Sequence, residues 1–121
     1  MLAGLQTDVP VSKPTDLVQG TLDLLILRIL ELEPLHGWAI AQRIRQMSRD
    51  VLQVGQSALY PALHKLERHG YVKARWKISE TNRRARYYWL TAAGRKAVVT
   101  EAANWERLSA AISIIARGSS T

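Results

Sequence analysis

The sequence predicts a mainly α-helical fold with one small β-hairpin, and three observations lead to this prediction. Apolar residues recur at helical spacing over several segments. A helical stretch at 57–70 keeps a polar outer face. It is followed by alternating apolar and basic residues at 72–78, a polar turn and a return run at 86–90. A helix beside a basic hairpin indicates a winged helix-turn-helix, because such a helix fits a DNA major groove while the hairpin tip meets neighbouring phosphates.

The N-terminal region, residues 1–18, has no apolar period and contains helix-breaking prolines, so we expect a flexible arm. We expect the first helix to follow, with Thr21 as its N-cap and Asp23 in its first turn. It should end before Pro34, since proline disfavours helix at the preceding residue. Its buried stripe comprises Leu22, Leu25, Ile26, Ile29 and Leu30. Further leucines lie beside that stripe, so the helix should be covered on more than one side.

The second and third helices form the predicted helix-turn-helix, joined by the short connection 50–55. The residues expected on the core face of the second helix are Trp38, Ile40, Ala41, Ile44 and Met47. Because proline is tolerated only near the start of a helix, Pro61 places the start of the third helix close to Ser57, and Gly70 suits its end. The inward face of the third helix comprises Leu59, Ala62, Leu63 and Leu66. The residues left outward or at the margins are Gln56, Ser57, Tyr60, Pro61, His64, Lys65 and Arg68.

The hairpin strands alternate in character. In the first strand, one face carries Val72, Ala74, Trp76 and Ile78, and the other carries Lys73, Arg75 and Lys77. In the second strand the alternation leaves open which face turns inward. We expect Tyr88 and Leu90 to face inward, because Leu90 leads directly into the last helix. We expect packing within the wing for Trp76 and Trp89.

The last helix should be long. Thr91 is its expected N-cap, and nothing interrupts it from Ala92 to about Ala116, which gives a rod of about 35 Å at 1.5 Å per residue. Its apolar stripe comprises Val98, Ala102, Trp105, Leu108, Ile112 and Ile115. Folding back over the core of its own subunit covers only the first half of such a rod. We therefore predict a homodimer. The predicted interface residues are Leu22, Ile26, Trp105, Leu108, Ile112 and Ile115.

These elements divide the chain into an arm (1–18), a winged helix-turn-helix domain (19–91), a C-terminal dimerisation helix (92–117) and a tail (118–121). The length of 121 residues supports a single core. The absence of cysteine fits a reducing cytoplasm. We recognise no signal peptide, and the longest apolar run, 24–27, is far too short for a membrane span, so we expect a cytoplasmic protein that does not engage a membrane.

The formal net charge of +7 is unevenly distributed. Residues 36–96 hold thirteen Lys and Arg but only three Asp and Glu, whereas the remainder is net acidic. All of the positive excess therefore lies in the segment that contains the third helix and the hairpin. Such localisation is typical of a polyanion partner. By charge alone a solvated basic surface is an equally good interpretation, and the helix followed by a basic hairpin favours double-stranded DNA.

The residues predicted to contact DNA are Gln56, Ser57, Tyr60, Pro61, His64, Lys65, Arg83 and Arg84. Lys65 can reach guanine acceptors or a phosphate, and Tyr60 can donate to a phosphate or touch a thymine methyl group. Ser57 also suits a helix cap. Arg83 and Arg84, at the hairpin tip, are predicted to contact phosphates or the minor groove. For His64 an ordinary solvated surface is an equally good interpretation.

In four ordered segments the chain resembles the PadR family of bacterial transcriptional regulators. The segments are Gly20-Thr21-Leu22-Asp23-Leu24-Leu25-Ile26-Leu27, Leu35-His36-Gly37-Trp38-Ala39-Ile40, Ser57-Ala58-Leu59-Tyr60-Pro61-Ala62-Leu63-His64-Lys65-Leu66-Glu67 and Arg86-Tyr87-Tyr88-Trp89-Leu90-Thr91-Ala92-Ala93-Gly94-Arg95. The resemblance runs from Val18 to Ile115, and the single C-terminal helix is similar to the smaller subfamily. It implies a dimeric winged-helix repressor that pairs through its first and last helices. Trp38 stands where the family often has tyrosine, and we interpret it as a core substitution.

The resemblance also implies that a small aromatic molecule can act as an inducer. A tryptophan in the middle of the last helix, Trp105, offers a flat polarisable surface for such a ligand at the dimer interface. The alternative is that Trp105 is simply the largest packing residue of that interface. The sequence contains no motif that identifies the inducer or the operator.

Other classes of function have less support. The chain has no cysteine, no glycine-rich phosphate loop and no Ser–His–Asp set, so we expect no enzyme activity and no cofactor. His36, His64 and His69 lack the spacing of a zinc site, so we expect no metal. The main alternative is a winged helix that docks RNA or an acidic protein without operator specificity.

Overall fold

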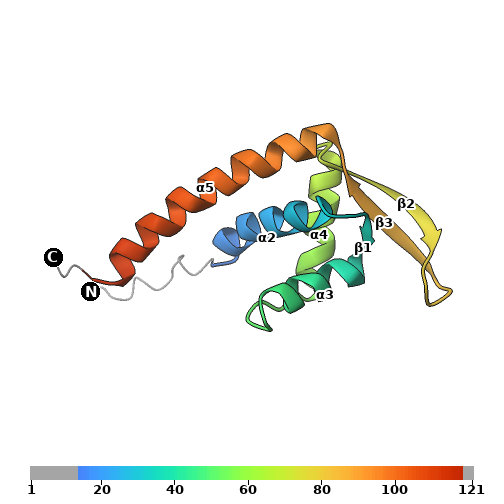
Figure 1. Ribbon diagram of the computed structural model, residues 1–121, viewed down its shortest axis with the longest axis horizontal. Helices are drawn as coiled ribbons and strands as arrows, with labels where there is room; N and C mark the ends of the chain where they lie inside the picture. The colour runs from blue at the N-terminus through green and yellow to red at the C-terminus, as the bar shows by residue number, and fades with distance from the viewer. Residues whose placement is uncertain (1–13, 119–121) are drawn as a thin grey trace.

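The computed structural model describes residues 14–118 (Figure 1). Its elements in chain order are α2 (Pro14–Leu30), β1 (Leu35–His36), α3 (Gly37–Met47), α4 (Gln56–Arg68), β2 (Val72–Ile78), β3 (Arg84–Leu90) and α5 (Ala92–Ala116). Helices α2, α3 and α4 pack together, and the sheet packs against one side of these three helices. Helix α5 runs back along α2. The prediction of a mainly helical fold with a small hairpin and a long last helix is confirmed. No described helix is long and apolar enough to cross a membrane.

Helix α2 begins at Pro14, so the expectation that Thr21 caps its first turn is wrong. Proline suits the first helical position, because the amide hydrogen that it lacks has no intrahelical acceptor there. Thr21 and Asp23 consequently lie inside the helix, and the part of the predicted arm from residue 14 onward is helical. The rest of that arm, residues 1–13, lies outside the described residues, as does most of the predicted tail.

The core is built around α2, which packs against α3, α4, α5 and β3. Leu22 and Ile26 are fully buried in it, and Ile26 has no exposed surface. The prediction that these two residues form the dimer interface is therefore wrong. Their stripe is covered by α4 and α5 of the same chain, which leaves no surface for a partner.

Helix α3 buries Ile40 and Ile44, one turn apart, against α2. Trp38 is 61% exposed and Met47 is likewise exposed, so their expected places in the core are wrong. Trp38 lies two positions before Ile40, which is more than half a helical turn around the axis. Its side chain therefore projects away from α2, and Met47 is the last residue of the helix.

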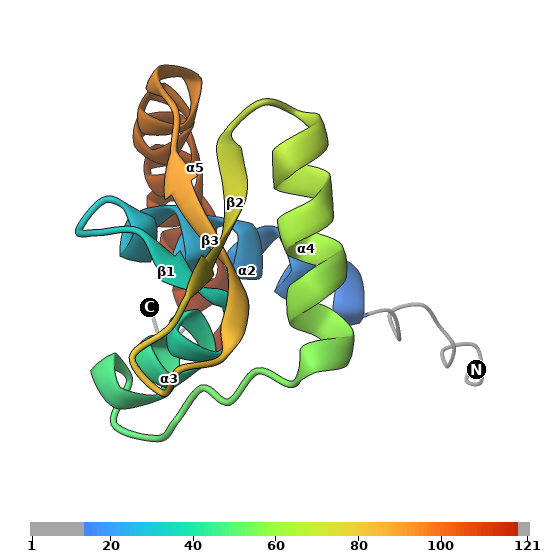
Figure 2. The same cartoon turned by 90° about the vertical axis from the view of Figure 1, so that its right-hand side faces the viewer.

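The sheet has the strand order β1-β3-β2, and both pairings are antiparallel. Strand β1 is only two residues long, too short to show a period in the sequence. Val72 pairs with Leu90 and Ala74 with Tyr88, which places Val72, Tyr88 and Leu90 in the core as expected. Figure 2 shows the sheet in front of α2, with α4 beside it.

The junction between sheet and α5 is tightly constrained. The Thr91 hydroxyl accepts a hydrogen bond from the Gly94 amide at 3.0 Å and donates one to the Gly70 carbonyl at 2.6 Å, so the predicted N-cap is confirmed. A Cβ atom on Gly94 would collide with the carbonyl oxygen of Tyr71. The start of α5 therefore packs directly against the backbone of Tyr71, the residue before β2. Val98 is buried, and the far end of α5 extends past the beginning of α2 (Figure 1).

Candidate nucleic-acid interface

The outer face of α4 follows from the residues that it buries. Leu59, Ala62, Leu63 and Leu66 are buried. The opposite face carries Ser57, Pro61, His64 and Arg68, all of which are exposed. The helix begins at Gln56, within one residue of the predicted start, and Gly55 is its N-cap. Ser57 is thus a helical residue and not the cap, so its side chain is free on the outer face.

Arg68 also lies on this outer face of α4, as its spacing in the sequence indicates, but it is absent from the predicted DNA contacts. It lies four residues after His64 and seven after Pro61, which is the spacing of one helix face. Its guanidinium group is the only cation of this outer face within α4. A long arginine on an exposed helix face presents a donor pair suited to guanine or to phosphate.

Lys65 does not point outward. Its ammonium nitrogen lies 2.6 Å from Oδ2 of Asp23 in α2, and the Asp23 side chain is only 16% exposed. Oδ1 of Asp23 is buried and has no hydrogen-bond partner among the described residues. The predicted contact of Lys65 with a guanine or a phosphate remains a prediction, and this ion pair favours a supporting role for the side chain. The side chain leaves α4 at the margin next to α2, where it is paired with the partly buried carboxylate of Asp23.

Tyr60 lies at the other margin of α4, toward the sheet. Its ring packs on Gly37 at the start of α3, and a Cβ atom on Gly37 would lie only 2.6 Å from the Tyr60 hydroxyl oxygen. The half-buried ring therefore joins the two helices. The hydroxyl end of Tyr60 is the part that packs against Gly37, so this ring serves the contact between α3 and α4.

The hairpin of β2 and β3 with its turn 79–83 forms the wing. At its tip the Ser79 amide donates to the Arg83 carbonyl at 2.7 Å, and Asn82 adopts a positive φ of 62°. Asparagine tolerates this left-handed conformation better than most residues. Arg83 lies in the turn and Arg84 begins β3, and both are exposed, as a contact with phosphates requires.

Each of three wing cations lies over an aromatic ring. The guanidinium of Arg84 is 4.8 Å from the Trp76 ring centroid, the Lys77 ammonium is 4.7 Å from Tyr87, and the Arg75 guanidinium is 5.7 Å from Trp89. By the strand register every pair is diagonal across β2 and β3. The pairs order the long basic side chains along the hairpin.

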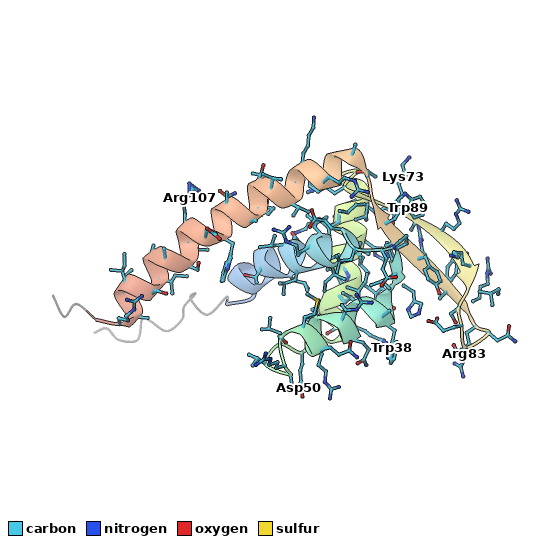
Figure 3. The ribbon with its side chains drawn as sticks, in the orientation of Figure 1. Trp38, Asp50, Lys73, Arg83, Trp89 and Arg107 are labelled. Atoms are coloured by element: carbon cyan, nitrogen blue, oxygen red, sulfur yellow. The ribbon has the colours of Figure 1, made fainter. Side chains whose placement is uncertain are left out.

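A cleft of about 870 Å³ separates the wing from α3 and α4. Its walls include Gly37 and Trp38 of α3, Tyr60 and His64 of α4, and Trp76 and Arg84 of the wing, and we call it the aromatic cleft. Figure 3 shows Trp38 and Arg83 at the same end of the molecule. Among the predicted DNA contacts, Tyr60, His64, Arg83 and Arg84 line this cleft, whereas Gln56, Ser57 and Pro61 lie exposed outside it.

The base of the cleft is held by an ion pair between α4 and the wing. Arg86 of β3 donates to a carboxylate oxygen of Glu67 at 2.8 Å. Next to this pair lies Tyr88, whose pKa is raised above 10.0 mainly by burial, an effect that the positive charge of Arg86 opposes. The Tyr88 phenol is therefore neutral at physiological pH. These contacts fix the angle between α4 and the wing.

An exposed polar helix face, a helix-turn-helix and a basic wing together define a winged-helix DNA-binding protein. The family model that matches residues 26–100 is the transcriptional regulator PadR-like family. The chain belongs to this family, and the predicted resemblance is confirmed. It is a family of transcriptional regulators.

Solved structures agree with this assignment. A transcriptional regulator from Clostridium thermocellum is 29% identical, with a TM-score of 0.74 over 83% of this chain and 97% of the other. A protein from Streptococcus mutans is 31% identical, with a TM-score of 0.70 over 83% and 90%. A PadR-family regulator from Eggerthella lenta is 25% identical, with a TM-score of 0.68 over 85% and 88%. An uncharacterized protein of Lysinibacillus sphaericus is 23% identical over 86% of this chain and 95% of its own length.

Proposed function

We propose that this protein is a homodimeric repressor that binds a two-fold-related operator in double-stranded DNA in the cytoplasm. The observation that carries the proposal is the exposed face Ser57, Pro61, His64 and Arg68 beside a wing rich in cations. This face is free of the core and projects from a rigid helix, which suits insertion into a major groove.

Within this proposal α4 reads the bases and the wing adds affinity. Arg68 and His64 contact base edges, while Gln56 and Ser57 in the first turn of α4 lie where a helix N-terminus attracts phosphate. Arg83 and Arg84 contact phosphates or the minor groove on the wing side. Lys65 holds α4 against α2 through its ion pair with Asp23, on the side away from the proposed DNA contacts.

The second half of α5 supports a second copy of the chain as the partner. Trp105, Leu108 and Ile112 are each about two-fifths exposed, and Ile115 is 80% exposed. These residues continue the stripe that begins with buried Val98. A two-fold axis through this stripe would bury the same residues from both subunits. It would also allow two α4 helices to meet successive major grooves, about 34–36 Å apart.

A small aromatic inducer at Trp105 is part of the proposal. Trp105 lies on the exposed stripe, so in a dimer its indole would face the partner subunit. A ligand bound there would alter the distance between the reading helices. The alternative role of Trp105, packing alone, predicts no change in DNA binding when aromatic ligands are added.

Footprinting of the purified protein on the DNA upstream of its own coding region tests the proposal. A repressor should protect a palindromic site, and its log affinity should fall linearly with log salt concentration. A module that docks RNA or an acidic protein would show no preference for a two-fold DNA site. That result would favour the alternative function.

A further inference from the structure

Two tryptophans of the aromatic cleft are unusually exposed. Trp38 is 61% exposed and Trp76 is 54% exposed. Both line the cleft, one from α3 and the other from β2. Large aromatic side chains that are held on a surface, outside the core, commonly mark a contact with another molecule.

The cleft also carries positive charge. Arg86 is compensated by Glu67, so Arg83 and Arg84 supply its uncompensated cations. The Arg84 guanidinium lies over one face of the Trp76 ring, which leaves its N–H groups free in their own plane. Glu80 is the acidic residue of the cleft lining, and its side chain is 85% exposed, 4.0 Å from His36. Solvent screens a carboxylate in that position.

The start of α3 adds backbone donors at the same place. His36 caps this helix by accepting a hydrogen bond from the Ala39 amide through Nδ1 at 3.2 Å. The amides of the first turn have no acceptor within their own helix, and Gly37 and Trp38 of this turn line the cleft. An anion next to Trp38 would therefore meet both helix-terminal donors and arginine side chains.

The position of the cleft indicates which part of DNA can enter it. His64 lines the cleft and also lies on the outer face of α4. When that face of α4 lies in a major groove, the sugar–phosphate backbone of one DNA strand lies between α4 and the wing. The bases of a duplex are stacked on one another, so the deoxyribose and phosphate groups are what the cleft meets.

We infer that the aromatic cleft receives the sugar–phosphate backbone of one DNA strand, with Trp38 and Trp76 against deoxyribose and Arg83 and Arg84 on the flanking phosphates. The inference rests on the proposed DNA binding and adds to it a clamp between α3 and the wing. Because backbone contacts carry no sequence information directly, this clamp contributes affinity and register to every DNA sequence.

The first test compares Trp38→Ala and Trp76→Ala with Trp89→Ala, a control on the other face of the wing and outside the cleft. Each cleft variant should bind operator and random duplex about tenfold more weakly, with their ratio unchanged. Hydroxyl-radical footprints should lose sugar protection at one position of each half-site. Unchanged affinity and protection in both variants, or a loss confined to operator DNA, would overturn the inference. Circular dichroism checks folding, which substitution of half-exposed side chains should preserve.

The second test uses the four tryptophans as reporters. Proteins that retain only Trp38 or only Trp76, the others being phenylalanine, should change fluorescence when saturated with duplex DNA. The protein that retains only Trp89, which packs under Arg75 on the other face of the wing, should not. Unchanged Trp38 and Trp76 signals, while labelled duplex still binds by anisotropy, would overturn the clamp and leave the regulator proposal intact. Failure of the wild-type protein to bind any duplex would overturn both.

Discussion

The ammonium group of Lys65 lies 2.6 Å from a carboxylate oxygen of Asp23, and this ion pair joins the reading helix α4 to the centre of α2. Asp23 is largely buried, and its other carboxylate oxygen has no hydrogen-bond partner in the described part of the chain. Removal of Lys65 would therefore leave a partly buried carboxylate without its compensating charge. Lys65, although it belongs to the proposed DNA-binding helix, thus stabilises the packing of α4 on α2.

We predict that Lys65→Met lowers the free energy of unfolding by about 1–3 kcal/mol, less than for a fully buried pair because Lys65 is partly solvated. Adding Asp23→Asn should recover part of this loss, with a coupling energy above about 0.5 kcal/mol in urea titrations. The ratio of operator to random-DNA affinity should stay within about twofold in Lys65→Met. Strictly additive stability effects, or a lost base preference, would contradict this role.

Arg68 and Arg83 should have separable effects on DNA binding. Arg68→Ala should weaken operator binding by about 1–3 kcal/mol and relax the preference at one position of each half-site, if it contacts a base. Arg83→Ala should weaken binding to all sequences and flatten the salt slope by about one unit for each lost phosphate contact. Fluorescence anisotropy with operator and scrambled duplexes measures both. Equal losses on both duplexes for Arg68→Ala would make it a phosphate contact.

The apolar stripe of α5 predicts that Ile112→Asp abolishes the dimer. A buried, unpaired carboxylate at the interface should cost several kcal/mol, about 3–5 for a charge left without a partner. Ile114→Asp is a matched control on the other side of α5, since Ile114 is two residues after Ile112 and therefore more than half a turn around the helix. Analytical ultracentrifugation should show a monomer only for Ile112→Asp. A stable Ile112→Asp dimer would exclude this stripe as the interface.

An inducer site at Trp105 predicts that planar aromatic compounds quench its fluorescence and release DNA. The experiment uses a protein in which Trp38, Trp76 and Trp89 are phenylalanine, so that Trp105 is the reporter. Saturation of the quenching should coincide with weaker operator binding, and Trp105→Ala should lose the release. If ligands quench Trp105 without changing DNA affinity, its role is packing alone.

Gly94 should be intolerant of a side chain. Gly94→Ala places a Cβ atom against the Tyr71 carbonyl and the Leu90 side chain, so we predict a loss of about 1–3 kcal/mol of stability. Gly20→Ala is the control, because nothing lies within 4 Å of its added Cβ atom and alanine favours the helix by up to about 1 kcal/mol. In thermal denaturation the melting temperature should fall for Gly94→Ala and rise for Gly20→Ala. A neutral Gly94→Ala would show that the start of α5 can shift.

Local pattern in the sequence predicts the elements and most of the core. The spacing of Leu59, Leu63 and Leu66 identifies the buried side of α4. The position of Leu90 directly before α5 correctly selects Tyr88 and Leu90 as the inward residues of β3. Thr91 is recognisable as a cap because capping depends on the next few residues only. Such features need no knowledge of the rest of the chain.

Tertiary structure alone decides which element meets each face. Periodicity shows that Leu22 and Ile26 are apolar, but only packing shows that α4 and α5 of the same subunit cover them. Lys65 looks like a groove contact until α2 brings Asp23 beside it. The exposure of Trp38 is different, because the helical period alone places it more than half a turn from Ile40. The physical reason is that a helical period specifies the direction of a side chain relative to its own axis, whereas burial and charge pairing depend on where other axes lie.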